Sequence, residues 1–537
     1  MKKFLTYLVL LFLSLGSLAT ETSEKKLPNV VFIICDDLND AIEGMGGHPQ
    51  TITPNLDRLE NAGVTFLNAQ TNCPICGPSR ASLWSGLYPH STGYFGYKQQ
   101  QNHWRKNPTL KNTVTLFEHL AGNGYQVYAT GKIHHNGHED WTIFNNANGE
   151  SGFKVKPSFG PYPWDGDPAT NNVKDRGVAY PYLPKNYKSN SPFDGFGPVC
   201  DISSAFNGKG TWLYNHDGKE FIYKSEKNRD LMPDERCVEY AENILNSRHD
   251  KPFFMAVGFN RPHSPCYVPE QYFEMFDKDS LQLAPFLKND LKDCAKSIWE
   301  DKDLGTGGTG FYKYSKLNKA NGEQALLQWT HAYLASIAFI DEQVGKVVEA
   351  VNNSKYADNT IIIVTSDHGY HMGEKEYIFK NTLWEESARI PFIVAGKGVA
   401  KGQKCSNPIS LIDVYPTIVD LCSLPDNPNK AGNNKLLDGH SLVPLLKNPM
   451  SGNWEGEDFA ITAVSSNYEL DVNQPGPVQK QHYSIRTEKF RYIYCRNGEE
   501  ELYDHQTDPY EWNNLANNPK YKKVKMELKA DLVKMCF

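Results

Sequence analysis

Five short apolar runs, separated by helical patterns, constrain the fold of this chain more than any other feature. They span residues 29–35, 125–130, 253–259, 360–365 and 391–395 and are rich in β-branched and aromatic side chains. Continuous apolar runs of this length are typical of parallel strands that are buried on both faces. Between them, Thr115 and Glu118 form a capping-box pattern, and an apolar stripe at helical spacing runs along residues 334–351. The alternation predicts an α/β fold.

The length of 537 residues allows one large domain and a smaller one. We place the larger domain at residues 27–448 and a C-terminal subdomain at residues 452–537, with the boundary in a polar stretch after the last apolar segment. Within the subdomain, residues 483–486 and 490–494 are predicted as antiparallel strands, and the chain from about residue 522 as a helix. Residues 140–230, rich in Gly, Pro, Asn and aromatics, are expected to form long loops over the sheet.

The N-terminus has the pattern of an export signal. Two lysines precede an apolar run over residues 4–15, and small residues follow at Ser17 and Ala19, so residues 1–19 are predicted as a cleaved signal peptide. The run is too short for a membrane span and no second one follows. No cysteine precedes Cys35, which argues against a lipid anchor. We therefore expect a secreted or periplasmic protein without a membrane anchor.

Composition excludes several other classes of protein. The net charge of −7 argues against a general nucleic-acid-binding surface, so an anionic ligand would need a local basic site. Eleven cysteines are too few for a disulfide-stapled scaffold, and their odd number leaves at least one sulfur unpaired within the chain.

Polar clusters directly follow four of the apolar runs. In open α/β sheets the ligand site lies beyond the carboxyl ends of the strands, so these clusters are expected to converge. Carboxylates such as Asp36, Asp37 and Asp367 suit Ca²⁺ or Mg²⁺ better than Zn²⁺. A single acidic pair after a strand, taken alone, is more often a helix cap or a solvated turn than a metal site. The clusters are Asp36 with Asp37, Lys132 with His134 and His135, His263, and Asp367 with His368.

The segment around Cys76 carries the strongest chemical signal. If a helix starts near Pro78, Cys76 lies at its positive end with free backbone N–H groups, where an anion binds favourably. Arg80, one turn later, can direct a permanently charged guanidinium at the same point. A rival interpretation of Cys73 and Cys76, which are separated by two residues, is a thioredoxin-like redox pair.

Here the sequence resembles the formylglycine-dependent (type I) sulfatases, whose signature is Cys-x-Pro-Ser-Arg with a glycine six residues after the arginine. Cys76, Pro78, Ser79, Arg80 and Gly86 match it. The resemblance covers most of the mature chain and looks closest to iduronate-2-sulfatase-like members. Further matching segments are residues 54–59, 366–369, 413–417 and 501–504.

The resemblance implies an alkaline-phosphatase-like sandwich: a large, mixed, mostly parallel sheet flanked by helices, and a C-terminal subdomain with an antiparallel sheet and a helix. It implies that a sulfatase-maturing enzyme converts Cys76 to formylglycine. It also implies a Ca²⁺ site, with Mg²⁺ as the less favoured ion. The metal ligands would be Asp36, Asp37, Cys76, Asp367 and His368, and the other catalytic residues would be Arg80, Lys132, His135, His263 and Lys380.

In the implied reaction, the hydrated aldehyde (a gem-diol) of residue 76 attacks the sulfur of a sulfate ester and forms a covalent sulfo-enzyme intermediate. Lys132, Lys380, Arg80 and the metal stabilise the charge, His263 protonates the leaving alcohol, and His135 removes the second hydroxyl proton. The resemblance favours a sulfated carbohydrate, from a glycosaminoglycan or an algal polysaccharide. Trp164 and Trp212 would either stack on sugar rings or pack in the core.

Two alternatives stay open at this point. One is a formylglycine-dependent phosphodiester or phosphonate monoester hydrolase of the same superfamily. The other is a non-catalytic, exported carbohydrate-binding protein with the same fold, which would require that a catalytic group be missing.

Overall fold

A computed structural model describes residues 26–100, 103–135, 143–144, 158–166, 182, 195–214, 219–299, 307–430, 434–450, 453–466 and 470–537. The predicted signal peptide and most of the predicted long loops between residues 140 and 230 lie outside the described residues. None of the helices in the described ranges is long and apolar enough to cross a membrane. All eleven cysteines fall within these ranges, and each has a free thiol.

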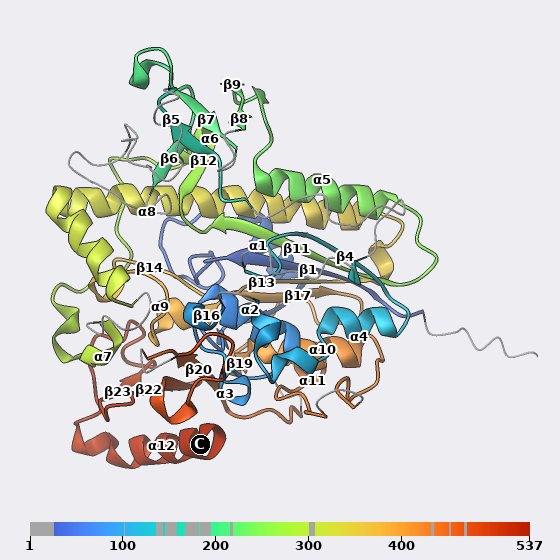
Figure 1. Ribbon diagram of the computed structural model, residues 1–537, viewed down its shortest axis with the longest axis vertical. Coiled ribbons are helices and arrows are strands. Elements are labelled where there is room, and N and C mark those ends of the chain that lie inside the picture. Colours follow the sequence, from blue (N-terminus) through green and yellow to red (C-terminus); the bar gives the residue numbers. More distant parts are fainter. Residues whose placement is uncertain are drawn as a thin grey trace, which may run out of the picture.

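A seven-stranded sheet with the order β18-β2-β17-β13-β1-β11-β4 forms the centre of the molecule (Figure 1). All five predicted apolar runs are strands of this sheet, which confirms the predicted fold class. Neighbours β13, β1, β11 and β4 are parallel. The strands are β1 (Asn29–Asp36), β2 (Gly63–Phe66), β4 (Gln126–Gly131), β11 (Phe253–Pro262), β13 (Thr360–Ser366), β17 (Phe392–Gly396) and β18 (Gln403–Cys405).

The expectation that residues 391–395 form a parallel strand is wrong, because β17 runs antiparallel to β13. Residue burial predicted the strand correctly, but an apolar run carries no information about direction. A parallel neighbour would need a crossover connection, usually a helix of a dozen or more residues. The only α-helix in the fully described segment between β13 and β17 is the four-residue α9 (Glu385–Ala388), and the rest is short strands and turns, so the segment has no crossover helix of that length.

Helices cover both faces of the central sheet (Figure 1). One face packs against α1 (Pro54–Ala62), α5 (Pro233–Asn246) and α8 (Gly307–Asn353), and the apolar stripe predicted over residues 334–351 lies on α8. Non-helical backbone at Asn321 and Gly322 divides α8 into two segments. The other face packs against α2 (Cys76–Ser85), α4 (Leu116–Gly122), α10 (Val414–Leu421) and α11 (Val443–Lys447).

The predicted capping box is present at the start of α4. The Thr115 hydroxyl accepts a hydrogen bond from the Glu118 backbone N–H, and the Glu118 carboxylate accepts one from the Thr115 backbone N–H. The box satisfies two backbone donors that a helix start otherwise leaves unpaired.

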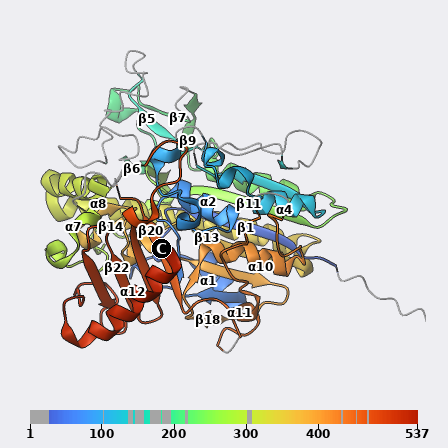
Figure 2. The same ribbon diagram turned by 60° about the horizontal axis from the view of Figure 1, so that its bottom comes forward.

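The C-terminal residues form a four-stranded antiparallel sheet with a helix packed on it (Figure 2). The strands predicted at residues 483–486 and 490–494 and the predicted terminal helix are confirmed. Buried side chains such as Ile461, Tyr483 and Leu532 fill the space between sheet and helix. The elements are β20 (Phe459–Val464), β21 (His482–Thr487), β22 (Phe490–Tyr494), β23 (Glu500–Asp504) and α12 (Lys522–Cys536).

Short elements surround these two sheets. Three two-stranded sheets are formed by β6 (Phe196–Val199) with β12 (Cys266–Pro269), by β9 (Tyr223–Ser225) with β10 (Asn228–Arg229), and by β14 (His371–Met372) with β15 (Ile378–Phe379). A three-stranded sheet contains β16 (Arg389–Ile390), β3 (Ala69–Gln70) and β19 (Ile409–Ser410). A further sheet contains β5 (Tyr162–Trp164), β7 (Thr211–Leu213) and β8 (Glu220–Phe221). The remaining helices are α3 (Pro89–Thr92), α6 (Glu270–Glu274) and α7 (Lys296–Trp299).

Candidate active site

Two neighbouring parallel strands carry the acidic residues of the site at their carboxyl ends. Strand β1 ends at Asp36 and is followed by Asp37, while β13 ends at Ser366 and is followed by Asp367 and His368. Cys35 is directly opposite Ser366 in the pairing of the strands, so the polar residues that follow emerge side by side. Asp37 adopts a left-handed backbone conformation (φ 66°), which turns the chain out of the sheet.

Cys76 is the first residue of helix α2, two residues earlier than the start expected near Pro78. The side chain is fully buried. Free N–H groups of the first turn and the helix dipole make this end electropositive. Gly86 closes the helix in a left-handed conformation (φ 67°) that glycine adopts without strain. The signature residues thus define one short helix from its first residue to its cap.

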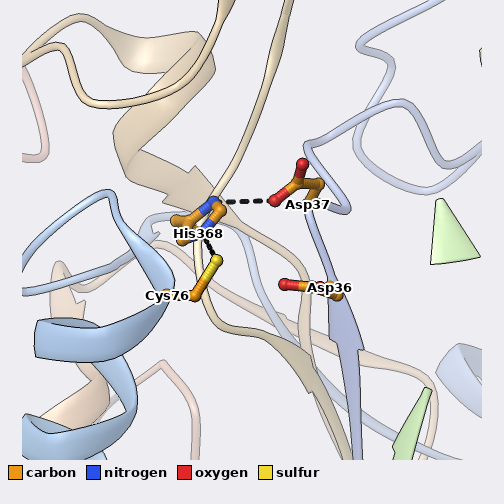
Figure 3. A group of neighbouring side chains, drawn as sticks. All are labelled: Asp36, Asp37, Cys76 and His368. Atoms are coloured by element: carbon orange, nitrogen blue, oxygen red, sulfur yellow. Dashed lines mark hydrogen bonds and ion pairs between the residues drawn. The ribbon is translucent and has the colours of Figure 1, made fainter. Parts of the chain in front are cut away.

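A compact cluster forms where the strand ends meet this helix (Figure 3). Potential ligand atoms of Asp36, Asp37, Cys76 and His368 all lie within 4.8 Å of one another, and all four residues are buried. His368 lies in the centre, with Nε2 3.2 Å from the Cys76 sulfur and Nδ1 3.5 Å from Asp37 Oδ1.

The donor set of this cluster fits a hard divalent cation. Asp36 Oδ1 and Asp37 Oδ2 are buried and accept no hydrogen bond from any of the described residues. Buried carboxylate oxygens are costly to leave without a partner, and Ca²⁺ prefers such ligands. Asp367, which the sequence grouped with the ligands, is beside this cluster rather than in it. Its Oδ2 lies 2.8 Å from Arg80 Nε, and its Oδ1 accepts hydrogen bonds from the backbone N–H groups of Asp37 and His368.

Three buried cations surround the sulfur and the carboxylates. Lys132 donates to Asp36, and Lys380 Nζ lies 2.5 Å from Asp37 Oδ1 and 3.2 Å from the Cys76 sulfur. Arg80 Nη2 lies 3.5 Å from Asp36 Oδ1. This arrangement concentrates positive charge around the side chain of residue 76, where a tetrahedral oxyanion would be stabilised.

The same charges shift the pKa values of the site. Burial raises the pKa of the Cys76 thiol, but Lys132, Lys380 and His368 outweigh burial and hold that pKa well below its usual value. Burial lowers the pKa of His368, yet the Asp367 carboxylate and the Cys76 sulfur together outweigh burial and raise that pKa to about 9. Burial raises the pKa of Asp367 to about 6, against the opposing effect of Arg80. The residue at position 76 is thus stabilised in an anionic form.

The three histidines singled out in the sequence have different surroundings. His135 lies beside Cys76, close enough that each side chain shifts the pKa of the other, whereas His134 stacks on Trp104 with ring centroids 5.0 Å apart, away from the sulfur. His263 points Nε2 toward Asp37, 3.7 Å from Oδ2, and Nδ1 toward the Ser264 carbonyl. The structure therefore brings His135 and His263 to the cluster and places His134 in the apolar core.

The structure also bears on the sequence interpretations of Trp212 and Cys73. Trp212 is buried, contacts Tyr267 edge-on, and donates to the Cys200 carbonyl, so it is a core residue. The Cys73 thiol donates to the Phe95 carbonyl and, because burial raises its pKa well above the usual value, stays protonated. Cys73 and Cys76 are not joined by a disulfide, and the Cys73 thiol is bound to a backbone carbonyl instead.

One residue at the cluster was not found from the sequence. The Tyr97 hydroxyl lies 3.6 Å from the Cys76 sulfur. Tyr97 follows Gly96 in a segment without helical or strand periodicity, so nothing in the pattern distinguished it from other aromatics.

Fold and site together define an alkaline-phosphatase-like hydrolase, in which the buried Cys76 lies between a carboxylate cluster and a set of cations. The sulfatase family model matches residues 28–424, and that of the C-terminal region of N-sulphoglucosamine sulphohydrolase matches residues 373–536. The chain therefore belongs to the formylglycine-dependent sulfatase family and is a sulfatase, as the sequence resemblance implied.

Relatives span nearly the whole chain. A sulfatase of Formosa agariphila is 32% identical over 98% of this chain and 91% of its own length. An N-acetylglucosamine-6-O-sulfatase of Bacteroides thetaiotaomicron is 27% identical over 96% of this chain and 88% of its own. A solved 2-O GAG sulfatase superposes with a TM-score of 0.63 at 21% identity, covering 95% of this chain and 92% of that one. The last comparison confirms the predicted fold.

Proposed function

We propose that this sulfatase removes sulfate from a sulfated carbohydrate, of glycosaminoglycan or algal origin, through Cys76 after its conversion to formylglycine. The main observation that supports this proposal is the position of Cys76. It is the first residue of α2, and its sulfur lies 3.2 Å from both Lys380 Nζ and His368 Nε2. The carbohydrate class is supported by relatives that act on sulfated sugars, such as the N-acetylglucosamine-6-O-sulfatase.

In this proposal, Asp36, Asp37, His368 and residue 76 hold a Ca²⁺ ion, with Asp367 as a further ligand; the buried carboxylate oxygens favour Ca²⁺, and Mg²⁺ is the less favoured ion. The ion would add positive charge beside the sulfate and favour loss of the nucleophile's proton. The formylglycine, once hydrated, offers two hydroxyl groups, one to attack sulfur and one whose proton is lost when the sulfate is released.

The chain's own residues supply the remaining chemistry. Lys132, Lys380 and Arg80 are fixed by their carboxylate partners and need little reorganisation to bind the sulfate oxygens. His135, beside residue 76, is the proposed base for its second hydroxyl, and His263, which faces Asp37, is the proposed acid for the leaving alcohol. Single substitutions of each histidine, analysed for burst and steady-state rates, test this division of roles.

Maturation and location follow from the same proposal. Formylglycine requires a sulfatase-maturing enzyme as a transient partner. The export signal predicted at residues 1–19 supports a working location outside the cytoplasm, in the periplasm or secreted. The proposed catalytic domain spans residues 27–448 and the C-terminal subdomain residues 452–537.

The test is mass spectrometry of the peptide containing residue 76, on protein from a host with a maturing enzyme, combined with turnover assays. We expect conversion of the thiol to the aldehyde and release of inorganic sulfate from sulfated oligosaccharides. Cys76→Ala should abolish turnover. An unmodified Cys76 in an active enzyme would refute the proposal that formylglycine at position 76 is the nucleophile. Faster turnover of phosphate diesters or phosphonate monoesters than of sulfate esters would favour the phosphoesterase alternative, and saccharide binding without turnover would favour the non-catalytic one.

A further inference from the structure

Tyr97 contacts both the proposed nucleophile and the proposed base. Its hydroxyl lies 3.6 Å from the Cys76 sulfur, and its ring packs against the His135 ring with centroids 4.9 Å apart and planes tilted by 31°. His135 also lies beside Cys76, so the three side chains are mutual neighbours. Tyr97 is partly exposed, as expected for a residue that lines the approach to the sulfur.

The segment that carries Tyr97 is rigidly held by a buried glutamine two residues later. Gln99 Oε1 accepts hydrogen bonds from the backbone N–H groups of Phe95 and Gly96, at 2.8 and 3.2 Å. Its Nε2 donates to the Gly93 and Gln474 carbonyls, both at 2.7 Å. Every polar atom of this side chain thus fixes the turn before Tyr97, and one contact ties the turn to the C-terminal part of the chain.

A second contact fixes the same turn. The Gly476 backbone N–H donates to the Gly93 carbonyl at 2.7 Å, so residues 476 and 474 hold the chain on both sides of Tyr97, at Gly93 and at Gln99. Side chains held by such networks lose little conformational entropy when a ligand binds and can be placed accurately. The position of the Tyr97 hydroxyl is therefore built into the fold.

We propose that Tyr97 is a further catalytic residue, whose hydroxyl donates a hydrogen bond to the reacting side chain at position 76. This inference rests on the proposed formylglycine function. In the hydrated residue, two oxygens occupy the region of the present sulfur. Tyr97 and His135 approach from one side and Lys380 and His368 also contact the sulfur. Tyr97 would bind the hydroxyl that His135 later deprotonates, and it would favour the hydrate over the free aldehyde.

The test compares two tyrosine hydroxyls of the same segment. Tyr97→Phe removes the hydroxyl but retains the ring packed on His135. Tyr94→Phe is the matched control, because the buried Tyr94 hydroxyl has no hydrogen-bond partner among the described residues. Tyr97→Leu removes the ring as well. Each variant is checked by mass spectrometry for formylglycine content and by thermal unfolding for its fold, and rates are normalised to the modified fraction.

Two quantities are measured on modified protein. The first is the rate of oxime formation with methoxyamine, which reports the free aldehyde; we expect Tyr97→Phe to react roughly three- to tenfold faster than wild type, the value of one net hydrogen bond. The second is turnover of a sulfate ester, where we expect kcat to fall at least about tenfold with KM little changed. Tyr94→Phe should match wild type in both.

The outcomes separate this proposal from the one on which it rests. If the wild type is modified and active but Tyr97→Phe behaves like Tyr94→Phe in both measurements, Tyr97 has no catalytic role and the sulfatase mechanism stands. If only Tyr97→Leu is impaired, the ring supports His135 by packing alone. An unmodified or inactive wild type would instead refute the proposed function.

Discussion

Arg80 and Asp367 form a fully buried ion pair, with 2.8 Å between Nε and Oδ2, that joins the signature helix α2 to the end of β13. Arg80 also donates to the backbone carbonyls of Lys132 and Ile133, so one guanidinium connects three segments of the site. Because the pair is completely removed from solvent, its effect is not screened as that of a surface pair would be.

Arg80→Ala should therefore damage stability and activity together. Removing one partner of a buried pair leaves an uncompensated charge, and we expect a loss of about 3–5 kcal/mol in the free energy of unfolding, measured by denaturant titration. As a control, Lys346→Ala removes an exposed pair with Glu342 and should cost less than about 0.5 kcal/mol. Equal effects of the two substitutions would contradict the structural role of Arg80.

The four-residue cluster predicts metal-dependent stability. If Asp36, Asp37, Cys76 and His368 hold Ca²⁺, the ion binds only the folded state, and chelation should lower the melting temperature until Ca²⁺ is restored. Asp37→Asn should remove most of this response in differential scanning fluorimetry. Asp293→Asn alters a second acidic group, formed with Asp290 and Cys294, and this variant should keep the response to chelation. Loss of the response only in Asp293→Asn would show that the ion binds at the group of Asp290, Asp293 and Cys294 instead.

The strand ends were predictable from sequence for a simple physical reason. Asp36 and Asp367 each follow a continuous apolar run, and parallel neighbours must place such residues at one edge. Hydrophobic patterning did not give the direction of β17, since burial is the same in either direction. Patterning also gave no sign that the Asp367 carboxylate pairs with Arg80, because that pairing depends on how α2 approaches the sheet. Tyr97 was missed because its segment is positioned by Gln99, not by periodicity.

Substitution of Gly86 is expected to destabilise the protein at the end of α2. It has a φ of 67°, and a Cβ there would lie 2.8 Å from Leu437 Cδ2 and 3.1 Å from Tyr415 Cδ1. Gly86→Ala should therefore combine left-handed strain with a clash and destabilise by roughly 2 kcal/mol or more, whereas strain alone is worth about 1 kcal/mol. Gly498→Ala is the matched control, because it has a φ of 89° but open space around it. Thermal unfolding of both variants measures the difference.

Acid should weaken a buried group of ion pairs within the C-terminal subdomain. Burial raises the pKa of Glu511, but Arg491 and His505 outweigh it and lower the pKa to about 2. A depressed pKa in the folded state means that the unfolded chain takes up the proton first. The stabilisation is thus complete above about pH 4.5 and is lost as the pH falls toward 2.

Glu511→Gln tests this linkage. The variant should be less stable than wild type at pH 7 by about 2 kcal/mol, and the difference should shrink as the pH falls from 5 to 3, since the wild type alone loses the ionised partner. Urea unfolding at each pH gives the free energies. Glu527→Gln, on the exposed surface of α12 beside Lys523, should show a small difference with little dependence on pH. A Glu511→Gln difference that stayed constant with pH would exclude the linkage.

Adjacent histidines provide the sharpest contrast between chemistry and packing. His135 lies beside Cys76, while His134 is buried between Trp104 and Trp84, with ring centroids 5.0 and 6.4 Å away. His135→Ala should lower kcat by about two to four orders of magnitude, the usual contribution of a general base, with little change in melting temperature. His134→Ala should destabilise by about 2–3 kcal/mol, because it leaves a cavity beside two tryptophans, while the folded fraction keeps most of its kcat. Measuring kcat per folded, formylglycine-bearing molecule separates the two effects. The opposite pattern, a stable but inactive His134→Ala and an active His135→Ala, would exchange the proposed roles.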